Sequence, residues 1–132
     1  MNKKLLLLFV AVLMATFTAS AYFNLFCDFS GKVGTYPVAG NIELGNVGEI
    51  WGTYGYKKNG KNPKAWLDLT GEWESISQTK FRLVMTESSN GKVTGYWNVV
   101  YDSSRRTITG SMTTNGKTYK VNITTSRAHI EN

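Results

Sequence analysis

The chain has 132 residues, of which 42% are hydrophobic and 18% charged, and 15 Lys and Arg against 9 Asp and Glu give a net charge of +6. This length fits a single domain. The charge excess is well below that of a nucleic-acid-binding protein, so we expect no nucleic-acid partner. Cys27 is the only cysteine, which excludes an intramolecular disulfide. Stability must therefore come from a packed hydrophobic core.

The first 21 residues are typical of a cleavable export signal. Two lysines precede the apolar run Leu5–Met14, and Ala19-Ser20-Ala21 supplies small residues at the positions that a signal peptidase reads. The run is shorter than the about 20 residues that a membrane-spanning helix needs. We therefore predict a signal peptide at 1–21, no integral membrane span after cleavage, and a periplasmic or extracellular location. An uncleaved anchor and a lipoprotein attached through Cys27 are the alternatives.

The rest of the chain shows period-two alternation of apolar and polar residues and no convincing helical periodicity. Such alternation, in short runs separated by Gly, Asn, Ser and Lys, predicts strands with one buried and one wet face. We expect a lead-in at 22–28, a single β-barrel domain at 29–125 and a polar tail at 126–132. The predicted strands are Phe29–Gly34, Val38–Leu44, Glu49–Lys57, Ala65–Glu74, Lys80–Glu87, Lys92–Tyr101, Thr107–Thr113 and Thr118–Thr125.

The predicted connections are short, so sequential strands should pair antiparallel as an up-and-down meander. Strands that share one apolar face close naturally into a barrel, which also removes the exposed sheet edges. Two turns support the register. Asn115-Gly116 is the favoured dipeptide of a two-residue type I′ hairpin, and Ser89-Asn90-Gly91 fits a three-residue loop. The predicted fold class is therefore an all-β, eight-stranded antiparallel meander barrel.

A short unit recurs along the strands: an apolar residue, any residue, glycine, any residue and a large apolar residue. Alternation places the glycine of each unit on the inner face. Two interpretations are open, because the missing side chains either let a small, strongly coiled barrel close or leave room for a ligand. The unit occurs at Phe29–Val33, Ile50–Tyr54, Leu69–Trp73, Val93–Trp97 and Ile108–Met112.

Gly-x-aromatic strands that follow an export signal resemble those of avidin-like and streptavidin-like barrels and, more loosely, lipocalin-like barrels. The chain resembles more closely small, uncharacterised, exported bacterial eight-stranded β-barrel proteins. The segments that carry this resemblance are Gly34–Val38, Tyr54–Lys61 and Thr86–Gly95. The resemblance implies a barrel fold and export, and it implies no activity.

Few residues offer catalytic chemistry. His129 is the only histidine, so neither a histidine-based triad nor a histidine metal cluster is available. Glu87 is the one inward-facing carboxylate, and we interpret it as a rim residue that reaches water. We therefore expect a non-enzyme with no catalytic residues, no bound metal and no cofactor.

Two sets of residues are candidates for binding. An aromatic interior favours a small apolar or aromatic ligand inside the barrel, whereas the many large inward side chains favour a filled or nearly filled interior. The interior candidates are Tyr54, Tyr56, Trp73, Trp97, Tyr101 and Glu87. Exposed aromatics and a lysine-rich loop favour contact with a protein, a glycan or a second copy of the chain. The surface candidates are Trp51, Trp66, Tyr96, Lys57, Lys58, Lys61 and Lys64.

The sequence thus predicts an exported, non-enzymatic small β-barrel that serves as a binding or interaction module. The alternatives are a barrel that holds a small apolar or aromatic ligand in its interior and an inhibitor of a secreted enzyme. Enclosed volume separates the first two, because an eight-stranded barrel is just wide enough to be filled by side chains or to hold one small ligand.

Overall fold

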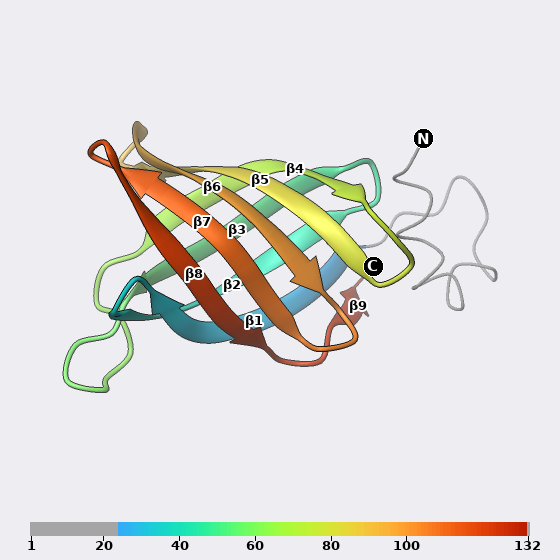
Figure 1. Cartoon of the computed structure of the whole chain (residues 1–132), viewed down its shortest axis with the longest axis horizontal. Helices are drawn as coiled ribbons and strands as arrows, with labels where there is room; N and C mark the ends of the chain where they lie inside the picture. Colours follow the sequence, from blue (N-terminus) through green and yellow to red (C-terminus); the bar gives the residue numbers. More distant parts are fainter. Residues whose placement is uncertain (1–23, 132) are drawn as a thin grey trace.

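A computed structural model describes residues 24–131, and the predicted signal peptide lies outside this range. The described chain forms a closed antiparallel barrel and a short ninth strand, as Figure 1 shows. The strands are β1 (Asn24–Val33), β2 (Tyr36–Gly45), β3 (Glu49–Tyr56), β4 (Leu67–Ser75), β5 (Lys80–Ser89), β6 (Lys92–Asp102), β7 (Thr107–Thr114), β8 (Lys117–Thr125) and β9 (His129–Glu131). No stretch of residues 24–131 forms a helix that is long and apolar enough to cross a membrane.

Each strand from β1 to β8 pairs with the next one along the chain, and the barrel closes where β8 pairs with β1. The closing register places Val33 opposite Val121. The predicted all-β, eight-stranded up-and-down barrel is therefore confirmed. Two segments extend the predicted strands: β1 begins at Asn24 rather than at Phe29, and β9 pairs with the first residues of β1.

Alternate residues of the strands point inward and fill most of the barrel. The largest fully buried side chains are Trp73, Trp97, Tyr54, Tyr101 and Phe81, followed by Ile and Leu residues. Full burial of one large apolar side chain contributes about 1.5–3 kcal/mol, so this core is what stabilises a chain without disulfides. Cys27 belongs to the same core, and burial raises the pKa of its thiol to about 12. The thiol therefore packs as an apolar group and is a poor nucleophile.

Asn-Gly dipeptides form tight turns at one end of the barrel, which we call the Asn-Gly end and which lies on the left in Figure 1. Asn115 and Gly116 connect β7 to β8 with φ angles of 51° and 74°. Positive φ at both positions is what a type I′ turn requires, as the sequence predicted. Asn90 and Gly91 connect β5 to β6 in the same way, with φ angles of 52° and 79°.

The predicted three-residue loop between β5 and β6 is therefore wrong. The extra residue lies inside β6, where the pairing shifts so that Ser88 faces Val93 but Glu87 faces Gly95. Thr94 is the unpaired residue of this bulge. The alternation that places Gly95 on the inner face predicts the same face for Val93, but the bulge changes the side on which Val93 lies, and Val93 is exposed.

Candidate functional site

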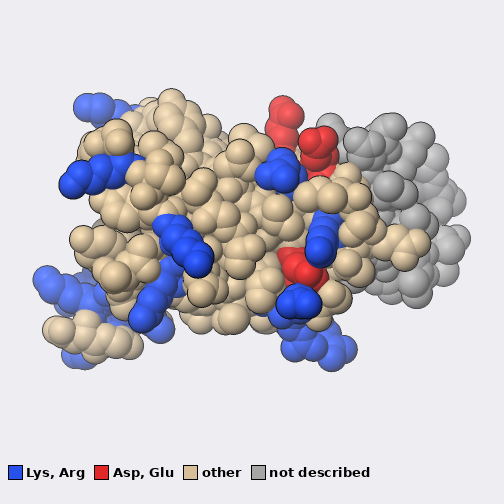
Figure 2. Space-filling view, in the orientation of Figure 1, with Lys and Arg blue, Asp and Glu red and all other residues tan. Residues whose placement is uncertain are grey.

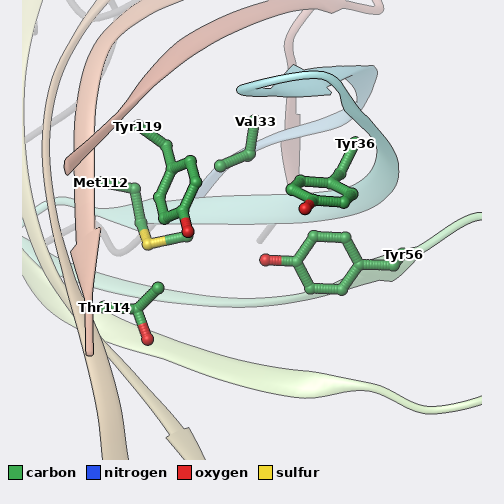
Figure 3. Close-up of a pocket in the computed structure, with 6 residues that line it drawn as sticks. All are labelled: Val33, Tyr36, Tyr56, Met112, Thr114 and Tyr119. Carbon is green, nitrogen blue, oxygen red and sulfur yellow. The ribbon is translucent and has the colours of Figure 1, made fainter. Parts of the chain in front are cut away.

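The packed core stops short of the Asn-Gly end, where a cavity of about 360 Å³ opens (Figure 3). This volume lies near the lower limit of small-molecule sites, which span about 300–1,000 Å³. The lining residues come from the ends of β1, β2, β3, β7 and β8. They are Val33, Tyr36, Tyr56, Met112, Thr114 and Tyr119.

Three tyrosines form the wall of the cavity. The two-residue turn between β1 and β2 pairs Val33 with Tyr36 and so brings Tyr36 over the barrel mouth. The Tyr36 ring meets the Tyr56 ring at a centroid distance of 6.2 Å and an interplanar angle of 88°, and the Tyr119 ring at 6.4 Å and 70°. Edge-to-face packing of this kind holds aromatic rings in place. Their hydroxyl groups point into the space between them (Figure 3).

A buried carboxylate lies close to this cavity. Glu87 is only 4% exposed. Its Oε1 accepts hydrogen bonds from the Tyr54 hydroxyl and from Trp97 Nε1, the latter at 3.1 Å, and its Oε2 accepts one from the Thr94 hydroxyl at 2.8 Å. The interpretation of Glu87 as a rim residue that reaches water is therefore wrong. Burying a carboxylate is costly unless hydrogen bonds replace its water, and here three uncharged donors do so.

Tyr54 connects this carboxylate to the cavity. Its hydroxyl lies 3.3 Å from the hydroxyl of Tyr56, which lines the cavity wall. Burial, reinforced by the hydrogen bond to Glu87, raises the pKa of Tyr54 far above its ordinary value. Burial also raises the pKa of Tyr56, against the opposing effect of its bond to Tyr54. Both phenols therefore keep their protons at neutral pH, and the network runs from the cavity to Glu87.

The structure brings together only part of the predicted interior set. Tyr54, Trp97 and Glu87 meet in the network described above. Tyr56 is 40% exposed and lines the cavity wall rather than the core. Two further candidates serve the core instead: Trp73 Nε1 donates to the Gly45 carbonyl at 2.8 Å, and the Tyr101 ring packs on Phe81 with centroids 6.0 Å apart.

Most of the lining residues were missed by sequence reasoning. Tyr36 was placed in a loop, although a two-residue turn at Gly34-Thr35 would have made it the first residue of a strand. The two-residue hairpin predicted at Asn115-Gly116 pairs Met112 with Tyr119, and the structure confirms that pairing. Both residues face inward near the strand ends at the same end of the meander. That shared position is the signal that could have identified them as part of a cavity wall.

The surface candidates do not form one patch. Trp66 lies with the lysine loop, and together they line a hollow of about 640 Å³ that shares Tyr56 with the cavity. The lysines of this hollow are Lys58, Lys61 and Lys64, and Lys57 lies just before them at the end of β3. Both Trp51 and Tyr96 are exposed as predicted. They lie on β3 and β6, with two strands between them, so they are about 14 Å apart across the sheet.

Other observations bear on what the site can do. In the part of the chain that the structure describes, no three His, Cys, Asp or Glu side chains are grouped to hold a metal ion. Comparisons of the chain with protein-family models, with curated proteins and with solved structures gave no match. The architecture of the described residues is a closed eight-stranded antiparallel barrel. Because a fold of this kind hosts many functions, function has to be argued from the site itself.

Proposed function

We propose that the protein is a non-enzymatic binding module that holds one small, mainly apolar or aromatic ligand at the Asn-Gly end of the barrel. The observation that carries this proposal is the 360 Å³ cavity, where the otherwise filled interior opens between aromatic and aliphatic side chains. A few hydroxyl groups in a mainly apolar, concave surface are what orients a ligand in a binding site.

The lining favours binding over catalysis. None of the six lining residues carries a carboxylate, an imidazole, a thiol or an amine. General acid–base catalysis needs a group whose pKa lies near the working pH within hydrogen-bond reach of the substrate. Burial raises the pKa of Tyr56 away from neutrality. The export signal predicted from the sequence is the reason to propose that the ligand is met in the periplasm or outside the cell.

Protein purified from its own host should retain a small molecule, visible in native mass spectrometry as added mass. Thr114→Trp should abolish that mass, because an indole at this lining position would occupy much of the cavity. The matched control is Thr113→Trp, since Thr113 points outward and pairs its hydroxyl with Thr118 on the barrel surface. Equal retention by both variants, or no added mass in the unmodified protein, would contradict the proposal.

A second candidate function is contact with an acidic protein or glycan. Each Asn-Gly tip at this end is followed by a lysine, at Lys61, Lys92 and Lys117. Figure 2 shows lysine and arginine side chains, and no acidic ones, at the left end of the face in view. A cluster of one sign of charge attracts partners of the opposite sign.

Changing Lys61, Lys92 and Lys117 together to Gln should lower the salt concentration that elutes the protein from immobilised heparin, an acidic glycan. Each exposed contact that is lost is worth about 0.2–1 kcal/mol. The control removes the same charge elsewhere, by changing Lys80, Arg105 and Arg127 to Gln. An equal shift with both triple variants would show that net charge alone sets retention and would contradict a localised contact.

A further inference from the structure

Two cavity residues, Tyr56 and Thr114, already donate their hydroxyl protons in hydrogen bonds within the protein. Tyr54 donates its single hydroxyl proton to Glu87, so the 3.3 Å contact between the two phenols must be donated by Tyr56. Thr114 donates its hydroxyl proton to the Thr94 carbonyl at 2.7 Å. The oxygens of Tyr56 and Thr114 therefore offer only lone pairs to whatever fills the cavity. A ligand group that contacts both must bring hydrogens.

The charge behind the cavity favours a cation. The donors to Glu87 are a phenol, an indole and a hydroxyl, all uncharged. None of these three donors is a Lys, Arg or His side chain, so the hydrogen bonds that hold Glu87 do not themselves neutralise it. Charges interact more strongly in the low-dielectric interior than in water. Aromatic walls add to this preference, because a cation within about 6 Å of a tyrosine ring is attracted to its face.

The lysines of the Asn-Gly end act in the opposite direction, but they lie outside the lining of the cavity. Lys61, Lys92 and Lys117 are exposed directly after the Asn-Gly turns and line no part of this cavity. Their field in solvent decays over about 10 Å at 0.1 M salt. The hydroxyl groups of Tyr36 and Tyr119 can donate to an anion, but the oxygens of Tyr56 and Thr114 offer it only lone pairs. The inner hydrogen-bonding groups therefore select against it.

We propose that the cavity binds the protonated primary amine of its ligand, with the N–H groups on the oxygens of Tyr56 and Thr114 and the negative charge of Glu87 behind them. The apolar or aromatic body of the ligand then lies among Val33, Met112 and the tyrosine rings. This inference rests on the proposed function, because it names the chemical class of the ligand for the same cavity.

Three probes with one common body test the inference by isothermal titration calorimetry on the purified chain: 2-phenylethylamine, 2-phenylethanol and 3-phenylpropionate. We expect the amine to bind at least about tenfold more tightly than the alcohol, because hydrogen bonds that involve a charged group are the stronger ones. We expect no saturable binding of the carboxylate.

Two variants test whether the preference for the amine depends on Tyr56 and Glu87. Tyr56→Phe should abolish it, because it removes an acceptor oxygen from a side chain that is partly exposed and not needed for the core. Glu87→Gln should abolish it with little change in side-chain size. Tyr96→Phe is the control, since Tyr96 is an exposed tyrosine of β6 that lines no part of the cavity. Circular dichroism melts confirm that each variant is folded.

The outcomes are separable. Tighter binding of the alcohol or the carboxylate, or binding equal to that of the amine, overturns the amine inference and leaves a cavity that binds small molecules. An amine preference that survives both Tyr56→Phe and Glu87→Gln overturns it as well. If the amine does not bind at all, the inference fails. The proposed function still stands if Thr113→Trp retains a host ligand and Thr114→Trp does not, and it fails as well if the two variants retain it equally.

Discussion

Gly71→Val should lower the free energy of unfolding by about 3 kcal/mol or more, although valine is the better strand former. A Cβ at position 71 would lie 2.0 Å from the carbonyl oxygen of Val84 and 2.8 Å from the Cα of Met85. Both atoms belong to the backbone of β5, so no side-chain rotation can relieve the overlap. The substitution would have to push β4 and β5 apart, which breaks the hydrogen bonds that join them.

Urea denaturation followed by tryptophan fluorescence measures this loss. Thr70→Val is the matched control, because Thr70 precedes Gly71 on β4 and points to solvent. We expect it to change stability by no more than about 0.5 kcal/mol. An unchanged midpoint for Gly71→Val would show that β4 and β5 do not approach each other as closely as described. It would also favour the other interpretation of the repeated glycines, in which they leave space for a ligand.

Trp73→Ser should lower the free energy of unfolding by about 3–5 kcal/mol. The Trp73 side chain is 1% exposed, and its Nε1 donates to the carbonyl of Gly45 at 2.8 Å. Serine would leave a cavity where the indole packs against Phe81, and it would leave the Gly45 carbonyl without its side-chain donor. Each of these changes is destabilising, and both follow from the single substitution.

Trp51→Ser makes the same chemical change on the outer face of β3, where the indole is 46% exposed. We expect it to shift the thermal midpoint by only a few degrees. Circular dichroism melts of the two variants compare the faces directly. Equal destabilisation would mean that the two sides of the strands are not inside and outside, which would contradict the barrel itself.

The barrel was predictable from the chain because nearly every strand has a water-facing side. Alternation marks this side without any knowledge of partners, and short connections then leave a meander as the simplest pairing. What alternation does not mark is a residue inserted within a strand. Nothing in the residue type of Thr94 distinguishes it from its neighbours, so the bulge was missed. The exposed position of Val93 and the pairing of Glu87 with Gly95 were missed with it.

The site was less predictable for a different reason. Tyr54, Trp97 and Glu87 could be placed on the inner face from parity alone, but β4 separates β3 from β5 along the sheet. Contact between their polar atoms depends on how tightly the barrel curves, and local sequence does not encode that distance. The solvated-rim interpretation of Glu87 followed from its place near a strand end, whereas the Tyr54 phenol and the Trp97 indole reach across to it.

The closing seam of the barrel has a consequence for how the chain folds. The pairs from β1–β2 to β7–β8 join neighbours along the chain, but β1 joins β8 through pairs such as Ser30 with Thr124. The entropic cost of closure grows with the length of the loop, so the hairpins should form early and the seam late. Until it forms, β1 and β8 are open edges that can pair with another molecule. Strand exchange between two folding chains would therefore occur at this seam, and β9, which pairs with Asn24–Phe26, covers the part of the β1 edge that β8 leaves free.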